Sequence, residues 1–178
     1  MQSSVPTKMN YFETILKGKD LRSIGQSNVV VAVVDNQNQF DELFHLFNHP
    51  DRKIVMRAAD AIENNSMKQD YLQPHKNDLL DLLYKAQVKE LKWHLALLVA
   101  RLELSDNEFS KVWQFLKKWA NDKKESKIVR VNSLQGLYIL SERNKEFKQD
   151  LFLTASMIQN ENIPSINARI KKLRLEWH

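Results

Sequence analysis

Cysteine is absent from the 178 residues, and this absence excludes disulfides, thiol nucleophiles, and zinc or iron–sulfur sites with cysteine ligands. Glycine occurs three times and proline four times, so few sharp turns are available and a sandwich or barrel of many short strands is disfavoured. The sequence also lacks a glycine-rich loop that could hold phosphates, so nucleotide-dependent chemistry is not expected.

Long hydrophobic runs are missing as well. The longest aliphatic stretch, residues 29–34, is far too short to cross a membrane, so no membrane partner is expected. The first residues do not place a basic region before an apolar one, as a secretory signal would. We therefore expect the chain to be cytoplasmic.

Apolar and charged residues make up most of what is present. Hydrophobic residues account for 43% of the chain and charged residues for 28%, which is enough for a packed interior with a polar surface. The net charge is +5. This charge is compatible with nucleic-acid binding, but many basic proteins bind no nucleic acid, so it shifts the balance only slightly.

The segment 89–102, KELKWHLALLVARL, is the most informative stretch. Every residue from Leu95 to Ala100 is apolar. A helix that is apolar nearly all round is covered on more than one side, so this segment is expected in the middle of a stack of helices.

Amphipathic segments joined by short connections follow one another from residue 38 onward. Ser105 and Glu108 form the pattern of a capping box, which predicts that a helix begins there and runs to about residue 120. The other predicted helices pair into hairpins, which favours an antiparallel helical array. The predicted helical segments are 38–47, 52–64, 78–85, 89–102, 106–120, 126–142, 145–158 and 163–177.

Residues 29–34, VVVAVV, allow two interpretations. Five valines among six residues prefer a strand locally. No partner strand is visible elsewhere in the sequence, and Ser27 or Asn28 can cap a helix. We expect a helix here, because tertiary packing often overrides local propensity.

A repeat of 37 or 38 residues organises the chain. Aligning the second helix of each hairpin places apolar residues in one column at Ile54, Leu91, Val129 and Ile166. Four positions further on stand Ala58, Leu95, Ser133 and Ile170, and seven positions further on stand Ala61, Leu98, Gly136 and Leu173. The small residues in these columns allow helices to approach closely, which best explains a glycine at position 136 inside a predicted helix.

Two helices per unit at this period resemble HEAT repeats, whose usual signature is Val-Arg-x-x-Ala at the start of the second helix. Residues 129–133, Val-Arg-Val-Asn-Ser, match it with serine for alanine, and residues 91–95 match it loosely. The chain is similar, more narrowly, to short bacterial proteins made only of HEAT units. The stretches that carry this similarity are Arg22-Ser23-Ile24-Gly25, residues 56–61 (MRAADA), Leu72-Gln73-Pro74 and Trp93-His94-Leu95-Ala96.

The resemblance covers about residues 21–173. It implies an all-α fold, an α-α superhelix in which HEAT-like hairpins form a right-handed solenoid, and it implies no particular activity. The expected organisation is one domain over residues 1–178, with a loose tail at 1–9, N-terminal capping helices at 10–36 and four hairpins over 38–177.

A polar column, defined here as Arg57, His94, Asn132 and Arg169, runs through the predicted second helices. In HEAT-like solenoids these helices line the concave surface, where partners usually sit. The side chains could bind acidic groups, peptide carbonyls or phosphates. Equally, they could hydrogen-bond from repeat to repeat, and His94 and Trp93 are open to a structural role. The candidate binding residues are Arg57, His94, Arg101, Asn132, Gln135 and Arg169.

Catalytic and metal sites find little support. His45 and His49 have the spacing of two metal ligands on a helix, but Leu46 stands where a zinc protease has glutamate, and no third ligand is evident. We predict no catalytic residue, no metal ligand and no cofactor.

A non-enzymatic module that binds a protein or peptide on its concave face is therefore the expected function. This expectation rests largely on fold analogy. The alternative is binding of DNA or RNA through a basic concave surface, similar to the one that HEAT-like DNA glycosylases use on DNA. A phosphate-driven interaction would weaken steeply as salt rises, whereas a partner held by a buried apolar anchor would not.

Overall fold

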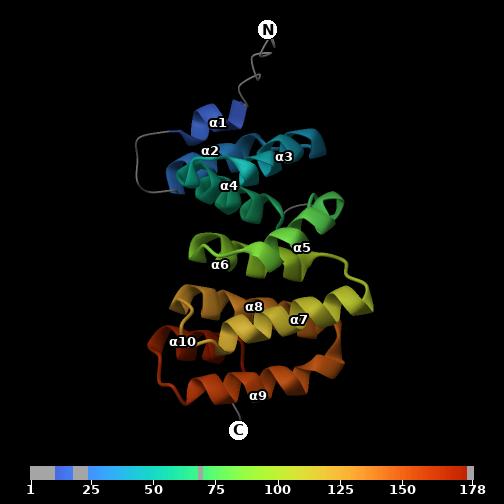
Figure 1. The fold of residues 1–178 in the computed structure, drawn as a ribbon, viewed down its shortest axis with the longest axis vertical. Helices are drawn as coiled ribbons and strands as arrows, with labels where there is room; N and C mark the ends of the chain where they lie inside the picture. The colour runs from blue at the N-terminus through green and yellow to red at the C-terminus, as the bar shows by residue number, and fades with distance from the viewer. Residues whose placement is uncertain (1–10, 18–23, 68–69, 176–178) are drawn as a thin grey trace. The chain divides into compact units, whose positions relative to one another are not determined.

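The computed structural model describes residues 11–17, 24–67 and 70–175, and all regular elements in these ranges are helices (Figure 1). The all-α class expected from the sequence is confirmed. The α-helices are α1 (Tyr11–Leu16), α2 (Ile24–Val33), α3 (Gln37–Phe44), α4 (Arg52–Asn65), α5 (Lys76–Lys85), α6 (Lys89–Leu98), α7 (Asp106–Asn121), α8 (Lys127–Arg143), α9 (Lys148–Gln159) and α10 (Pro164–Lys172). Short 3-10 helices are η1 (His45–Asn48), η2 (Gln73–His75), η3 (Val99–Arg101) and η4 (Lys145–Phe147).

The chain divides into two compact units, Met1–Tyr71 and Leu72–His178. In the N-terminal unit, α2 and α3 both pack against α4, and α1 packs against α2. The expectation of one domain over residues 1–178 stays a prediction. The sequence also predicts that Gly18 ends the first helix, and this residue lies outside the described ranges.

The valine-rich stretch forms a helix, as predicted. Val30 and Val34 are buried, whereas Val29 is half exposed. The hydroxyl of Ser27 donates a hydrogen bond to the carbonyl oxygen of Arg57 on α4, at 3.1 Å. Packing against α4 thus overrides the strand preference of the valines.

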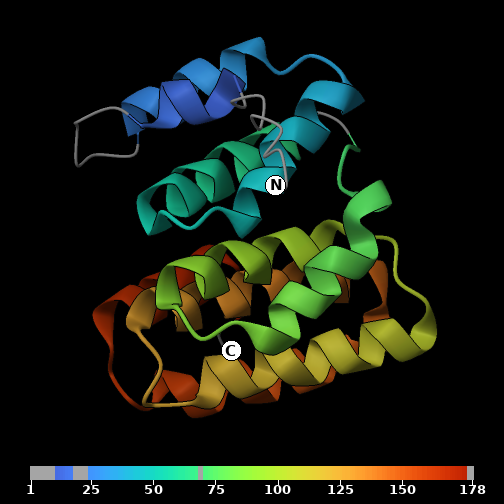
Figure 2. The same ribbon diagram turned by 45° about the horizontal axis from the view of Figure 1, so that its top comes forward.

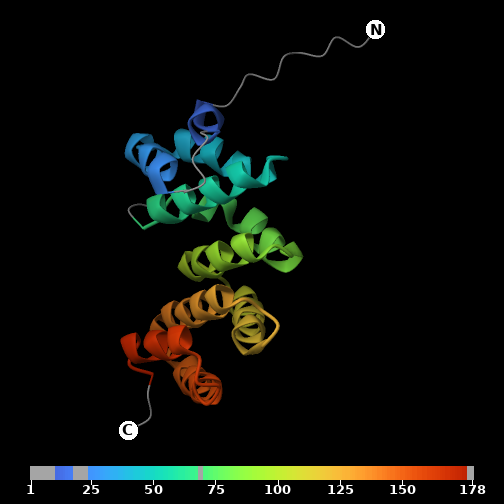
Figure 3. The same ribbon diagram turned by 90° about the vertical axis from the view of Figure 1, so that its left-hand side faces the viewer.

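The C-terminal unit is built around α8. This helix packs against α6, α7, α9 and α10. Figure 3 shows α8 in orange between α6 in yellow-green and α10 in red, and Figure 2 shows the same unit from another side. The apolar run from Leu95 to Ala100 is fully or almost fully buried, as the sequence predicts for a helix covered on several sides.

Side chains in the repeat columns form the interior of each unit. Ala58, Ala61 and Ile54 are buried in the N-terminal unit. In the C-terminal unit the buried members include Leu95, Leu98, Val129, Ser133, Ile166, Ile170 and Leu173. The period read from the sequence is therefore the period at which helices contribute to the core.

Most predicted helix ends are confirmed within two or three residues. The Ser105 hydroxyl accepts from the Glu108 backbone N–H while the Glu108 carboxylate accepts from the Ser105 backbone N–H, so the capping box is present at the start of α7. Ser126 caps α8 in the same way through the backbone N–H of Val129.

The last helix is the exception: it was predicted to run to residue 177, and α10 ends at Lys172. Arg174 has a φ of 54°, in the left-handed region. The backbone N–H of Leu175 donates to the carbonyl of Ile170, and that of Arg174 donates to the carbonyl of Lys171. These two bonds form a Schellman motif, which terminates the helix. This helix end could not be predicted from the sequence, because Arg174 occupies the left-handed position where glycine is usual.

Candidate functional site: a groove over helices α6, α8 and α10

A groove of about 590 Å³ lies on the C-terminal unit, lined by three second helices of the hairpins. We call it the α6–α8–α10 groove. Its apolar lining comes from Trp93 on α6, Ile128 and Val131 on α8, and Ala168 on α10. Its polar lining consists of Lys127, Asn132, Ser165, Arg169 and Lys172. A groove of this volume falls in the range of sites that hold small ligands or short chain segments.

The charged side chains that line the groove are all cationic. They are Lys127 at the start of α8, and Arg169 and Lys172 on the last two turns of α10. No aspartate or glutamate lines the groove among the described residues. The groove is therefore suited to a ligand that carries negative charge.

Arg169 is the most enclosed of these cations. Its Nη1 donates a hydrogen bond to Oε1 of Gln135 on α8, at 2.6 Å. Burial lowers the pKa of Arg169 below its ordinary value, because the charged guanidinium has lost part of its water. Its partner in this bond is a neutral amide, so the guanidinium charge is desolvated without being neutralised there.

Asn132 lies in the lining of the groove and is only 9% exposed. Its side-chain amide makes no hydrogen bond within the described part of the chain. Buried amides nearly always have partners. An amide offers both donors and an acceptor, which is the combination that a peptide backbone requires.

Some of the apolar side chains that line the groove are exposed to solvent. Ile128 is 42% exposed although it is a large aliphatic residue. Trp93 is partly buried, its ring lies 4.6 Å from the ring of His94, and its covered indole N–H has no acceptor among the described residues. Together these side chains offer an apolar surface beside the cations.

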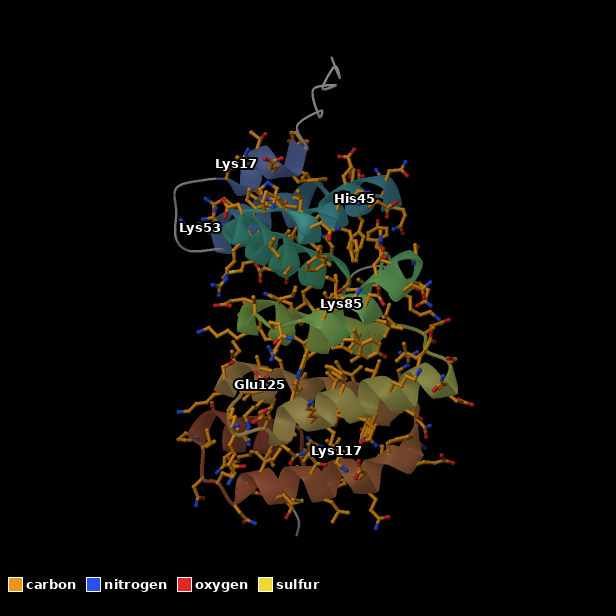
Figure 4. All side chains as sticks on the ribbon, viewed as in Figure 1. Lys17, His45, Lys53, Lys85, Lys117 and Glu125 are labelled. Carbon is orange, nitrogen blue, oxygen red and sulfur yellow. The ribbon has the colours of Figure 1, made fainter. Side chains whose placement is uncertain are left out.

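Carboxylates near these helices are already engaged by cations. Glu125 pairs with Lys92, whose ammonium also lies 5.5 Å from the centre of the Trp119 ring. Glu161 pairs with Arg130 through two bonds of 2.9 Å. Lys117 on α7 points toward α9 and its ammonium pairs with the carboxylate of Asp150 on that helix, at 2.6 Å (Figure 4). These pairs link successive hairpins, and each one neutralises a cation.

The residues predicted for the binding site have different surroundings. Asn132 and Arg169 both line the α6–α8–α10 groove, and Gln135 accepts a hydrogen bond from Arg169. His94 is 4% exposed and lies beside Trp93. Arg101 lies on η3 and does not line this groove.

Arg57 belongs to the N-terminal unit and is 4% exposed. Its Nη1 donates to the carbonyl oxygen of Leu16 at the end of α1, and its own carbonyl accepts from Ser27. The contacts of Arg57 therefore join α1, α2 and α4. A binding role for the polar column as a whole stays a prediction.

Lys127, Ile128 and Ser165 line the groove but were not predicted from the sequence. Ile128 directly precedes the buried Val129, so its side chain points away from the core at the first turn of α8. An exposed isoleucine at a fixed offset from a buried column was the signal that could have indicated it.

A second hollow, of about 470 Å³, lies near the start of α7 and the end of α8. Its lining mixes Arg143 with Asp106 and Glu146, and Arg143 donates to the carbonyl of Leu102. This hollow contains charges of both signs, and the Arg143 guanidinium already has a hydrogen-bond partner. Its lining therefore does not indicate the charge of a ligand, as the lining of the groove does.

The histidine pair considered for metal binding is arranged differently from a metal site. His49 approaches Glu13 at 3.3 Å through Nε2, and its Nδ1 accepts from the backbone N–H of Asp51. His45 is exposed. Within residues 11–17, 24–67 and 70–175, no group of three or more potential ligands gathers. None of the helices in those ranges has the length and hydropathy needed to span a membrane.

The fold and the groove define a class of all-α protein in which paired helices stack at a fixed period. The chain matches the family model for the HEAT repeat domain over residues 17–175, and it belongs to that family. This confirms the family resemblance drawn from its motifs. No curated protein and no solved structure matches the chain.

Proposed function

We propose that the chain is a non-enzymatic interaction module and that the α6–α8–α10 groove holds a short peptide segment of a partner protein. The HEAT repeat family supports the general role of a helical interaction scaffold. The observation that carries the proposal is the combination in one groove of an exposed Ile128, an Asn132 amide without a partner among the described residues, and enclosed Arg169.

Each part of this lining matches one part of a peptide. Apolar lining accepts a side-chain anchor, which supplies most of the affinity in such interfaces. The Asn132 amide can pair with a peptide N–H or carbonyl. The cytoplasmic location and the absence of catalysis stay predictions of the sequence.

Selection of displayed random peptides on the immobilised protein tests this proposal. Peptides that are enriched on the wild type should bind Ile128→Asp at least about tenfold more weakly, because the charge destroys the apolar lining. Leu153→Asp is the matched control: Leu153 is 49% exposed on α9, lies outside the groove, and should leave binding unchanged. Equal loss in both variants, or no enriched peptide at all, would refute the proposal, once circular dichroism shows both variants folded.

Nucleic-acid binding is the second candidate, favoured by the net charge of +5 and by the cations of the groove. The ion pairs of Glu125 and Glu161 count against it, because they neutralise Lys92 and Arg130, two cations that a nucleic acid would otherwise use. Titration with a labelled oligonucleotide at several salt concentrations separates the two. A nucleic-acid site should show a slope set by the number of phosphate contacts, roughly two to three for the three cations here.

A further inference from the structure

The hydrogen bonding and partial burial of the Arg169 guanidinium indicate which kind of peptide the groove would hold. A guanidinium presents five N–H donors in a planar fork that fits a carboxylate. The one side-chain hydrogen bond found for Arg169 among the described residues is to Gln135, so most of the fork is available. Partial burial strengthens any interaction that this charge makes with an anion, because less water competes for it.

Two other cations of the C-terminal unit are each paired with a carboxylate. Arg130 has Glu161 and Lys92 has Glu125, and both cations are largely buried. Arg169 is partly buried, and less deeply than Arg130, but it has no carboxylate within ion-pair distance in the part of the chain that the structure describes. The contrast indicates that the carboxylate for Arg169 comes from a ligand.

Lys127 and Lys172 extend the positive charge along the groove. Both are exposed, and neither has an ion-pair partner among the described residues. Exposed ammonium groups contribute less affinity than the enclosed guanidinium, and their contribution falls as salt screens them. They would steer an acidic segment toward the groove and favour it over a neutral one.

The apolar lining distinguishes a peptide from a phosphate chain. Ile128 and Ala168 offer no hydrogen bond to a phosphate or a sugar, but they fit an aliphatic or aromatic side chain. Trp93 completes this surface. A ligand that satisfies the whole lining must therefore carry a bulky apolar group beside a carboxylate.

We propose that the α6–α8–α10 groove recognises an acidic peptide segment, with a carboxylate on Arg169 and an adjacent bulky apolar side chain against Ile128 and Trp93. This inference rests on the proposed peptide-binding function and adds the charge and side-chain class of the peptide. Asn132 then pairs with the main chain of the same segment.

Two matched pools of fluorescein-labelled octapeptides test the inference. The acidic pool places Asp or Glu beside Leu, Phe or Trp, and the neutral pool replaces each acid with Asn or Gln. The acidic pool should bind at least about tenfold more tightly, and Arg169→Gln should remove most of that difference. Arg169→Lys, which keeps the charge but loses the fork, should recover only part of it.

Lys172→Gln and Lys171→Gln form the control pair on α10. Both lysines are exposed, but only Lys172 lines the groove. Lys172→Gln should weaken binding of the acidic pool by about twofold to threefold, whereas Lys171→Gln should not change it. Thermal unfolding of each variant reports whether the fold is retained.

The outcomes separate this inference from the proposed function. Equal binding of both pools with no effect of Arg169→Gln, while Ile128→Asp still abolishes binding, overturns the acidic peptide and keeps the peptide groove. Displacement of the acidic pool by a dT20 oligonucleotide at stoichiometric concentration overturns it in favour of nucleic acid. Binding that is indifferent to Ile128→Asp overturns both.

Discussion

Gly136 on α8 faces the backbone carbonyl of Ala96 on α6 so closely that no β-carbon fits between them. A β-carbon there would also lie 2.9 Å from Cδ1 of Leu116 on α7. Glycine inside a helix costs stability, but at this position it lets three helices meet. The close approach expected for Gly136 from the repeat columns is thus present in the structure.

Gly136→Ala should therefore destabilise the C-terminal unit by about 2 kcal/mol, because the backbone of α6 must move to admit the methyl group. Gly25→Ala is the control: a β-carbon at Gly25 on α2 would meet nothing within 4 Å. That variant should be stabilised by about 0.5 kcal/mol through its higher helix propensity. Urea unfolding followed by circular dichroism measures both, and a neutral Gly136→Ala would show that the helices are not in close contact.

Arg130 and Glu161 give the fold a dependence on pH. Arg130 is 2% exposed, and its guanidinium also donates through Nε to the carbonyl of Ala120. Its hydrogen bonds to Glu161 hold the pKa of that carboxyl below the ordinary 4.5. Since the folded pKa is lowered, the pair stabilises the protein above pH 4.5 and this contribution is lost as the pH falls through the folded pKa.

Glu161→Gln should cost about 2 kcal/mol at pH 7, because it leaves the buried guanidinium without a counter-charge. The difference in free energy of unfolding between wild type and variant should shrink as the pH is lowered from 5 towards 3. Urea titrations at several pH values measure it. A difference that stays constant with pH would mean that the charge of Glu161 contributes nothing.

Ser133 is a residue whose replacement should improve the fold. It is fully buried on α8, and its hydroxyl oxygen has no hydrogen-bond partner among the described residues. Ser133→Ala removes an unsatisfied hydroxyl and raises helix propensity, so it should stabilise the protein by about 1 kcal/mol. Ser141 on the same helix is also buried, but its hydroxyl donates to the carbonyl of Tyr138 at 2.8 Å. Ser141→Ala should accordingly be neutral or destabilising, and a gain of equal size in both variants would argue against the assigned cause.

The sequence was most informative where a physical requirement repeats. Buried columns at helical spacing, Gly136 at a close approach and the capping box of Ser105 each follow from packing or hydrogen bonding that local sequence encodes. The end of α10 was missed because Arg174 adopts a left-handed conformation that its residue type disfavours.

The site was less predictable because a helical spacing does not tell which polar side chains line a groove. Asn132 and Arg169 fall in the groove, while Arg57 and His94 at the equivalent positions are buried at 4% exposure each. The difference depends on which neighbouring carbonyl or ring each side chain meets, and those neighbours are distant in sequence. Leu16, the partner of Arg57, precedes it by 41 residues.

Arg57 allows the shared role of the polar column to be tested directly. No tryptophan precedes residue 93, so tryptophan fluorescence does not report on the N-terminal unit, which ends at Tyr71. Arg57→Ala removes a buried charged donor from the carbonyl of Leu16, which should destabilise the N-terminal unit by about 2 kcal/mol. Hydrogen exchange of the backbone amides in α4 should become faster, while the fluorescence-detected unfolding of the C-terminal unit and peptide binding in the groove should not change.

Lys53→Ala, an exposed position on the same helix, is the control and should leave all three readouts unchanged. Loss of peptide binding in a folded Arg57→Ala protein would instead mean that the polar column acts as one binding surface.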